Sequence, residues 1–364
     1  MRRPPPPHFS QEAAPDELCI VRLSALGDVT MTTPLAMAIR RHWPRTRIAW
    51  VVQPLPGRLL EGSPAVDELI PFERLRGRAA IAEYAGFRRR MKPRAFDLLL
   101  CPQKALKAGI LTGLLNAPVK VGFDRARSSD LHGFFTTHAI PASPRRHKVD
   151  ETLEFAHALG IPAGPVEWGL RTTSEERSRA EEFLAGPEPL VCGIVVGTSH
   201  PGKNWPAERW IHVVDALAEQ HGARVVLLGG PSREEGAIAA SILEGARNRP
   251  TCALGNDLRH LMALLEGCDL VLSPDTGPLH IAVALGTPVV GLYGRTNPNL
   301  HGPWGPSRPF VADGFERAPG EAYGNLDRYR DEGMSRITPE MVLLRVGELL
   351  RVRGEAGPAS AIGG

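Results

Sequence analysis

The sequence has little that would place it in a membrane, in a secreted disulfide framework or around a metal ion. No apolar run approaches the roughly 18–20 residues that span a bilayer, and the start, MRRPPPPHFSQEAAPDE, lacks the apolar segment of a signal peptide. The five cysteines are odd in number and form no CxxC pair, which favours reduced, buried thiols. HExxH and carboxylates at metal-ligand spacing are also missing. We therefore expect a cytoplasmic chain that uses no metal and no cofactor.

The length and composition fit a folded chain of two domains. At roughly 100–200 residues per domain, 364 residues are enough for two hydrophobic cores. Hydrophobic residues make up 43% and charged residues 23% of the chain. Glycine (38) and proline (34) stay below the level that is typical of disorder.

The net charge of +3 conceals a strong asymmetry between the two halves. Residues 1–148 carry 24 Lys and Arg against 12 Asp and Glu, whereas residues 149–364 carry 19 against 28. A basic first half indicates an anionic partner, either nucleic acid, a membrane surface or a polyanionic substrate, unless the charges are merely dispersed over a solvated face. No RNA- or DNA-binding motif accompanies the charge, so we expect no nucleic acid.

Apolar runs that resemble buried strands alternate with helical patterns, which predicts α/β layers with parallel sheets. The runs are Cys19–Leu23, Ile48–Val52, Asp97–Cys101, Val191–Val196, Val225–Leu228, Leu270–Leu272 and Val289–Tyr293. The Pro-, Gly- and polar-rich segment IPAGPVEWGLRTTSEE marks the boundary. We predict a disordered tail over 1–16, a first domain over 17–168, a second over 169–335, a helix over 336–353 and a second disordered tail over 354–364.

Ligands of parallel α/β sheets bind beyond the carboxyl ends of the strands, so the loops that follow the strands are informative. Asp28 lies in the turn between the first strand and a helix predicted over Thr30–Arg41. Its carboxylate can act as a general base or can cap the helix. The turn has a single glycine, which excludes the GxGxxG fingerprint of dinucleotide binding.

Three further loops lie at predicted strand ends in the second half. GTSHPGKNW contains Lys203, the only lysine after position 148, and a compact ammonium there suits a phosphate. SPDTGPLH leads into a helix whose first N–H groups favour an anion, unless it is an ordinary capped helix start. GGPSREE places acids at a helix start, where they suit the helix dipole or bind ribose hydroxyls.

Four ordered motifs together resemble glycosyltransferase family 9, the ADP-heptose:lipopolysaccharide heptosyltransferases, over roughly Cys19 to Pro306. They are RLSALGDVTMTTP, GTSHPGKNWPAERW, LGGPSREE and SPDTGPLHIAVALGTPVVGLYGRTNP. The stretch VGFDRARSSD is similar to the heptosyltransferase I branch. The resemblance implies a GT-B fold, in which two Rossmann-like domains with parallel sheets face an interdomain cleft. It also implies an inverting, metal-independent transfer of heptose from ADP-heptose to the Kdo/heptose inner core of lipopolysaccharide.

The resemblance also implies roles for particular residues. Asp28 would be the general base, and Lys203 would neutralise the diphosphate. Donor binding would use Glu234, or Glu235 as a one-residue alternative, together with Thr198, Ser199, Asn256, Asp275, Thr276, Gly277 and His280. The acceptor-side cations would be Arg22, Arg76, Arg78 and Arg127. Arg295 and Asn297 depart from the proline and aspartate that are usual in the family's Gly-Pro-Thr-Asp-Pro turn.

The implied partners are a nucleotide sugar, the anionic lipopolysaccharide inner core, and the cytoplasmic face of the inner membrane through peripheral contact. Three alternatives stay open: a glycosyltransferase that uses another nucleotide sugar, a GT-B sugar-nucleotide 2-epimerase, and a nucleotide-sugar-binding protein without catalysis. Asp28 and Lys203 occur together, which argues against the non-catalytic protein.

Overall fold

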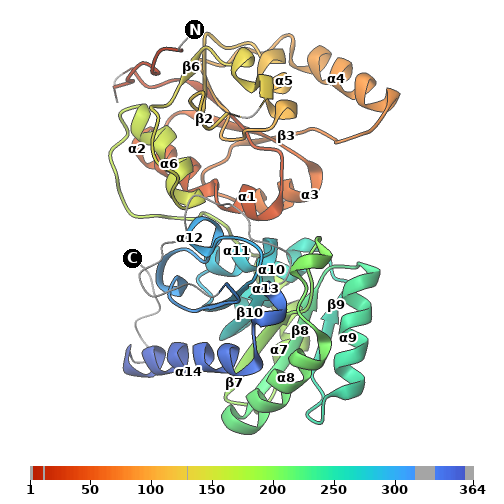
Figure 1. Cartoon of the computed structure of the whole chain (residues 1–364). Helices are drawn as coiled ribbons and strands as arrows, with labels where there is room; N and C mark the ends of the chain where they lie inside the picture. Colours follow the sequence, from red (N-terminus) through yellow and green to blue (C-terminus); the bar gives the residue numbers. More distant parts are fainter. Residues whose placement is uncertain (1–2, 11–12, 129, 316–332, 357–364) are drawn as a thin grey trace. The chain divides into compact units, whose positions relative to one another are not determined.

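The computed structural model describes residues 3–10, 13–128, 130–315 and 333–356. The chain divides between Arg171 and Thr172 into two compact units, which we call unit 1 and unit 2. Each unit contains one sheet of six strands in which every pairing is parallel. These two sheets confirm the predicted α/β fold with two Rossmann-like parallel sheets (Figure 1).

The sheet of unit 1 has the order β3-β2-β1-β4-β5-β6. Its strands are β1 (Glu17–Val21), β2 (Arg47–Val52), β3 (Glu68–Pro71), β4 (Leu98–Leu100), β5 (Val119–Gly122) and β6 (His138–Ala139). Its helices are α1 (Leu26–Thr30), α2 (Thr33–His42), α3 (Pro54–Gly57), α4 (Arg78–Met91), α5 (Leu106–Leu114) and α6 (Lys148–Ala158), with short 3₁₀ turns at Arg58–Leu60 and Asp130–Phe135.

The central strands of unit 1 are buried on both faces, as near-continuous apolar runs predict. Cys19 and Val21 face one core with Phe87 of α4 and Leu111 of α5. The helix predicted over Thr30–Arg41 is divided, because α1 ends at Thr30 and α2 begins at Thr33. Proline at the second position of α2 has no N–H, so it fits the start of a new helix but not the interior of a continuous one.

The sheet of unit 2 repeats this topology with the order β12-β11-β10-β7-β8-β9. Its strands are β7 (Leu190–Val195), β8 (Ala223–Gly229), β9 (Thr251–Leu254), β10 (Leu270–Pro274), β11 (Val289–Tyr293) and β12 (Val311–Asp313). Its helices are α7 (Ser174–Leu184), α8 (Ala207–His221), α9 (Arg233–Gly245), α10 (Leu258–Gly267), α11 (Gly277–Ala284), α12 (Pro298–His301), α13 (Gly333–Arg336) and α14 (Pro339–Ala356), with 3₁₀ turns at Pro201–Lys203 and Gly305–Ser307.

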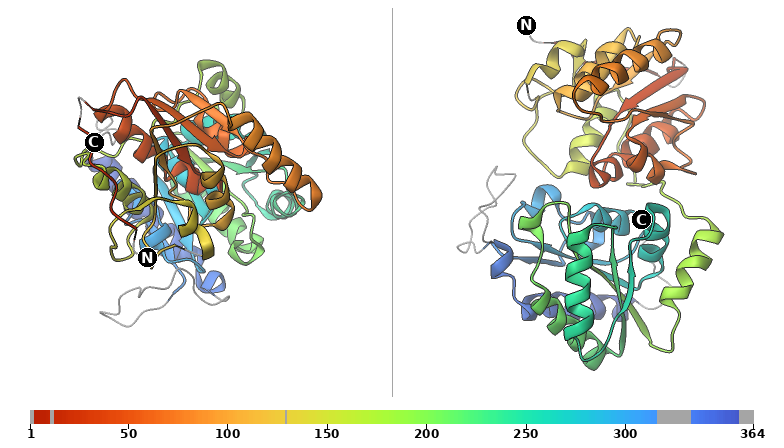
Figure 2. Two further views of the ribbon diagram at one scale, coloured as in Figure 1. Left: turned by 90° about the horizontal axis from the view of Figure 1, so that it is seen from above. Right: turned by 90° about the vertical axis from the view of Figure 1, so that its right-hand side faces the viewer.

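Helices pack around the sheet of unit 2 in two groups (Figure 2). The first group is α8, α9 and α14, and the second is α7, α10 and α11. The core beneath the first group contains Trp205 and Trp210, whose rings meet edge to face with centroids 4.7 Å apart. Both tryptophans are therefore core residues.

Parts of both predicted tails make contacts or form helix in the structure. The carbonyl of Pro4 accepts a hydrogen bond from the N–H of Ala139, and Phe9 packs edge to face on Trp43. At the other end α14 continues to Ala356, three residues beyond the predicted helix, and residues 357–364 lie outside the described part of the chain. Within that part, no helix combines the length and the apolarity needed to cross a membrane.

Candidate active site

In unit 1 the candidate site lies at the carboxyl ends of β1 and β4, which are neighbours in the sheet although they are far apart in sequence. The connections from these two strands run to opposite sides at this point, which is the topological switch point where open α/β sheets bind ligands. A cavity of about 230 Å³ opens here. Its lining residues are Arg22, Asp28, Met31, Thr32, Pro102, Gln103, Lys104, Ala105, Phe123, Lys148, Glu151 and Thr152.

Asp28 uses its two carboxylate oxygens for different contacts. Oδ2 accepts a hydrogen bond of 3.2 Å from the N–H of Ala25 at the start of α1, and Oδ1 lies 2.7 Å from a guanidinium nitrogen of Arg22. Both of the roles open from the sequence, a capping group and a reactive carboxylate, are thus compatible with its position. The side chain is 37% exposed and lines the cavity, so a ligand in the cavity can reach it.

The loop that carries Asp28 is anchored from both neighbouring strands. The side chain of Gln103, after β4, accepts a hydrogen bond of 2.8 Å from the N–H of Leu23. The indole of Trp50, in β2, donates a hydrogen bond of 3.0 Å to the carbonyl of Arg22. Because Gln103 and Trp50 are themselves buried, they restrict where the Asp28 carboxylate can lie.

Only one of the four predicted acceptor-side arginines lines this cavity. Arg22 does so, and its guanidinium also donates to the carbonyl of Pro102. Arg76 and Arg78 are exposed at the start of α4. Arg127 is mostly buried and forms ion pairs with the carboxylates of Asp124 and Glu154, so in the structure it acts as a structural residue of unit 1.

The cavity contains two lysines that sequence reasoning missed. Lys104 follows β4 and Lys148 begins α6, and their ammonium groups lie 2.7 Å and 3.0 Å from the two carboxylate oxygens of Glu151. Burial of Glu151 opposes its ionisation, but the charges of Lys148 and Lys104 outweigh burial and hold the pKa of Glu151 below its ordinary value. The position of Lys104 just beyond a predicted strand was the signal that could have found it.

In unit 2 the corresponding switch point lies between β7 and β10. Lys203 comes from the 3₁₀ turn that follows β7, and Asp275 follows β10. The Lys203 ammonium lies 2.5 Å from Asp275 Oδ2 and 3.4 Å from the Asp275 carbonyl oxygen. The structure thus brings together two predicted donor-binding residues that are 72 positions apart in the sequence.

Asp275 is the centre of a buried polar cluster. Besides Lys203, the hydroxyl of Thr296 donates a hydrogen bond of 2.6 Å to its Oδ2, and His280 Nε2 lies 3.6 Å from its Oδ1. Burial alone would raise the pKa of Asp275, but the imidazole of His280 and the charge of Lys203 outweigh it and hold that pKa well below its ordinary value. An ionised Asp275 therefore fixes the position of the Lys203 ammonium.

The helix start that was predicted to attract an anion is present at α11. Thr276 is its N-cap in an extended conformation, Gly277 is its first residue, and proline follows. In the described part of the chain the Thr276 side chain makes no capping hydrogen bond, which leaves the first N–H groups of the helix to a ligand oxygen. His280, in the first turn, is buried against Asp275.

The remaining predicted donor residues lie in loops after β7, β8 and β9. The hydroxyl of Thr198 is hydrogen-bonded within its own loop to the backbone of His200, and Ser199 is exposed. Asn256 lies after β9 and donates to the carbonyl of Ala253. These residues come from different loops, yet all follow the carboxyl ends of strands in one sheet.

The structure distinguishes between the two candidate ribose-binding acids. Glu234 is exposed on α9. Glu235 turns back toward the strand ends, where its carboxylate accepts a 3.0 Å hydrogen bond from the N–H of Gly230 and a 2.6 Å hydrogen bond from the hydroxyl of Ser232. A Cβ placed on Gly197, in the loop after β7, would lie 2.6 Å from Glu235 Cγ. Glu235 is therefore the acid nearer to the switch point.

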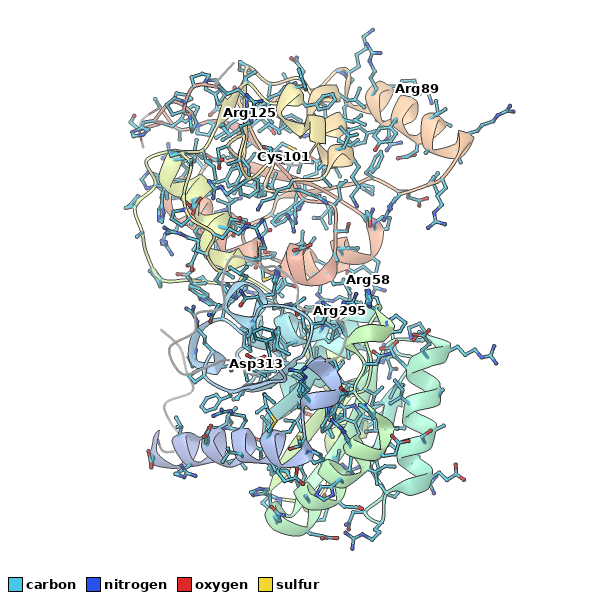
Figure 3. All side chains as sticks on the ribbon, viewed as in Figure 1. Arg58, Arg89, Cys101, Arg125, Arg295 and Asp313 are labelled. Atoms are coloured by element: carbon cyan, nitrogen blue, oxygen red, sulfur yellow. The ribbon has the colours of Figure 1, made fainter. Side chains whose placement is uncertain are left out.

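Arg295 is a second cation beside the Lys203 loop. It follows β11 (Figure 3), and a Cβ placed on Gly202 would lie only 2.2 Å from its Nη1. Glycine at position 202 thus leaves room for the guanidinium, next to Lys203 in the chain. Asn297, the second departure from the usual turn, is buried and caps α12 by accepting a 3.0 Å hydrogen bond from the N–H of Asn299.

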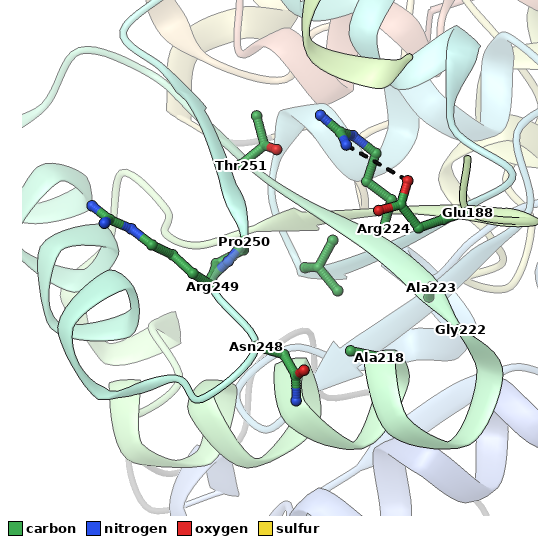
Figure 4. Close-up of a pocket in the computed structure, with 10 residues that line it drawn as sticks. Glu188, Ala218, Gly222, Ala223, Arg224, Asn248, Arg249, Pro250 and Thr251 are labelled. Atoms are coloured by element: carbon green, nitrogen blue, oxygen red, sulfur yellow. Dashed lines mark ion pairs between the residues drawn. The ribbon is translucent and has the colours of Figure 1, made fainter. Parts of the chain in front are cut away.

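A cavity of about 330 Å³ in unit 2 lies at the opposite ends of the strands, beside the amino ends of β8 and β9 (Figure 4). Arg224 and Glu188 form an ion pair of 3.6 Å at its edge. None of the predicted donor residues lines it, and ligands of such sheets bind at the carboxyl ends. In the described ranges, no group of three or more His, Cys, Asp or Glu residues could hold a metal ion.

Comparison with known proteins agrees with this arrangement. Residues 84–325 match the model of glycosyltransferase family 9 (heptosyltransferase). The chain is 33% identical over 294 residues to the lipopolysaccharide core heptosyltransferase OpsX of Haemophilus influenzae, covering 80% of this chain and 82% of that protein. It is 30% identical over 312 residues to lipopolysaccharide heptosyltransferase 1 of Pseudomonas aeruginosa, covering 82% and 84%.

Among solved structures, the Escherichia coli heptosyltransferase WaaC with ADP superimposes with a TM-score of 0.73 at 24% identity, covering 91% of this chain and 99% of that one. This similarity confirms the predicted GT-B fold. Fold and matches together define a glycosyltransferase. The chain belongs to glycosyltransferase family 9, as its four motifs predicted.

Proposed function

We propose that this enzyme transfers a heptose from ADP-heptose to the Kdo/heptose inner core of lipopolysaccharide, with inversion at the anomeric carbon and without a metal ion. The observation that carries the proposal is the position of Asp28 and Lys203, each just beyond the switch point of its own sheet. The names of the relatives from Haemophilus influenzae and Pseudomonas aeruginosa support lipopolysaccharide as the acceptor.

On the acceptor side, Asp28 acts as the general base. Its carboxylate accepts the proton of the acceptor hydroxyl while the oxygen attacks the anomeric carbon of the donor sugar, and a base of this kind contributes about 10²- to 10⁴-fold to the rate. The Arg22 guanidinium, 2.7 Å from Asp28 Oδ1, holds the carboxylate in position before the acceptor binds.

On the donor side, the enzyme must stabilise the diphosphate that leaves as ADP. Lys203, Arg295 and the N–H groups at the start of α11 supply positive charge and hydrogen-bond donors for it. Asp275 serves as a positioning residue, because its carboxylate holds the Lys203 ammonium. Cationic side chains then perform the charge neutralisation that a divalent metal performs in other transferases.

The rest of the donor is bound by residues from other loops of unit 2. Glu235 binds the ribose hydroxyls, Asn256 contacts the nucleotide, and Thr198 and Ser199 contact the diphosphate.

We further propose that the enzyme works in the cytoplasm and contacts the inner membrane peripherally. The segment from residue 74 to residue 92, which includes α4, exposes seven cations, Arg74, Arg76, Arg78, Arg88, Arg89, Arg90 and Lys92. Arg89 projects from the outer side of α4 (Figure 3), and the apolar side chain of Ile81 is 71% exposed beside these cations. Each cation near an anionic bilayer contributes about 1 kcal/mol of attraction. Vesicle flotation that shows no dependence on anionic lipid would remove this part of the proposal.

The deciding experiment measures ADP release from ADP-heptose with and without a Kdo-containing lipid A acceptor. We expect acceptor-dependent release that is lost in Asp28→Ala, and nuclear magnetic resonance of the product should show an inverted anomeric configuration. Added chelator should leave the rate unchanged. Acceptor-independent conversion of the sugar nucleotide would instead indicate an epimerase, binding without turnover would indicate a non-catalytic protein, and release only from another nucleotide sugar would change the donor.

A further inference from the structure

The cavity next to Asp28 contains an excess of positive charge that general base catalysis does not require. Its lining includes three cationic side chains, Arg22, Lys104 and Lys148, but only two carboxylates, Asp28 and Glu151. Arg22 pairs with Asp28, whereas both lysines share Glu151. The lysine half of the cavity is therefore the half that carries the surplus charge.

Glu151 holds the two lysines close together at a defined place. Its side chain is only 4% exposed, and each of its oxygens accepts a hydrogen bond from one ammonium, 2.7 Å from Lys104 and 3.0 Å from Lys148. Lys104 also lies 4.7 Å from the centroid of the Phe123 ring, a cation–π contact that limits its movement. Two ammonium groups fixed in this way are prepared for a further anion without a large loss of side-chain entropy.

Burial makes a further anion favourable at this place. Loss of water around Lys104, and next the charge of Lys148, lower the pKa of Lys104, although Glu151 opposes both effects. A ligand carboxylate would offset the repulsion between the two ammonium groups. A volume of about 230 Å³ lies below the roughly 300–1,000 Å³ of sites for drug-sized ligands, so the cavity suits a single sugar unit.

We propose that Lys104 and Lys148, held by Glu151, form a subsite that binds the carboxylate of an acidic acceptor sugar and so presents one of its hydroxyls to Asp28. The subsite deepens the proposed function and rests on it for the transfer step. Lys104 and Lys148 are specificity-determining residues, and Glu151 is a positioning residue. Ammonium groups bind a carboxylate more tightly than its uncharged amide, so the enzyme selects the acid form of the acceptor.

The test compares two probes that differ only in charge, the methyl glycoside of Kdo and its carboxamide. Binding of each is measured by calorimetry, and transfer by ADP release from ADP-heptose. Loss of one hydrogen bond to a charged group corresponds to about a 10- to 100-fold change in affinity. We therefore expect Lys104→Met to weaken carboxylate binding by that factor, to leave carboxamide binding unchanged, and to leave the KM for ADP-heptose unchanged.

Lys120→Met is the matched control, because Lys120 is another half-buried lysine of unit 1 that lies outside the cavity. It should keep the preference for the carboxylate, and thermal melting of both variants checks that they fold. Lys148→Met provides a second variant with the same expected selectivity loss. If Lys104→Met and Lys148→Met each lost as much affinity for the carboxamide as for the carboxylate, the cluster of Lys104, Lys148 and Glu151 would have only a structural role, and the subsite would be refuted.

Binding and transfer together separate the two proposals. Lysine-dependent binding of the carboxylate without any transfer would retain the subsite and refute the heptosyltransferase function of the site. Transfer to the carboxylate and the carboxamide at equal kcat/KM would retain the function and refute the subsite. Neither binding nor transfer by the wild-type enzyme would refute both.

Discussion

Replacement of Asp28 by asparagine should abolish catalysis without unfolding the enzyme. Asparagine keeps an oxygen that can accept the hydrogen bond from the N–H of Ala25, so the start of α1 is retained. The substitution removes the ion pair with Arg22, but a carboxylate that is 37% exposed contributes only about 0–1 kcal/mol through such a pair. We therefore expect a melting-temperature change of at most a few degrees, since about 1 kcal/mol shifts the melting temperature of a unit of this size by roughly 2–4 °C.

The catalytic effect should be far larger. Loss of a general base typically lowers the rate by about 10²- to 10⁴-fold, so kcat for acceptor-dependent ADP release should fall by at least about 100-fold. Donor binding, measured by calorimetry with ADP, should stay the same, because the residues assigned to the donor belong to unit 2.

Asp67→Asn is a close control for this substitution. Asp67 is also in unit 1, pairs with an arginine, accepts a backbone hydrogen bond of 2.7 Å from Ile48, and is 39% exposed. Its replacement should have a similar effect on stability and none on turnover. Near-normal turnover of Asp28→Asn, or equal loss of turnover in both variants, would refute the assignment of Asp28 as the base.

Four further outcomes follow from unit 2 and from the thiols. Lys203→Met and Arg295→Ala should each weaken ADP binding by about 10- to 100-fold in a calorimetric titration, and unchanged affinity in both would contradict the phosphate role of this loop. Folding lowers the pKa of Asp275, so its contribution to stability is present above the ordinary carboxyl range and is lost as the pH falls through the lowered pKa. In urea titrations below about pH 4, the free energy of unfolding of Asp275→Asn should therefore fall less with acid than that of the wild-type enzyme. Trp210→Ala should destabilise unit 2 by about 3–5 kcal/mol, since the ring is fully buried and packs edge to face on a second buried tryptophan. Cys252 is exposed and the other cysteines are buried, so one thiol per native chain should react rapidly with Ellman's reagent, and that reaction should disappear in Cys252→Ser.

The most buried strands could be predicted because a strand that is buried on both faces has an almost continuous apolar sequence. The apolar runs at Ile48–Val52 and Val289–Tyr293 match β2 and β11 closely. The strands that sequence reasoning missed, such as β6 with two residues and β12 with three, are short and lie at sheet edges. Strands of two or three residues are too short to show a periodic pattern of apolar side chains, so they could not be recognised from the sequence.

Much of the candidate site could likewise be predicted, because the parallel topology turns a local feature into a spatial one. A polar loop after an apolar strand must lie at the carboxyl edge of the sheet, and this reasoning located Asp28, Lys203 and Asp275. The same reasoning applies to Lys104, but the position of its ammonium group depends on Glu151, which is 47 positions away in the chain.

The sequence by itself thus determined the family, the two α/β units and the loops that carry the chemistry, since each of these is written in contiguous motifs. The tertiary structure decided which charges meet. It bound Arg127 to Asp124 and Glu154 inside unit 1, and it gathered Lys104 and Lys148 around Glu151 beside Asp28. The choice between Glu234 and Glu235 is local instead, because Ser232 caps α9 and thereby sets the rotation of the helix that turns Glu235 toward the strand ends. The contacts of Arg127 with Glu154 and of Lys104 with Glu151 depend on the packing of elements that are distant in the chain, and no local pattern encodes them.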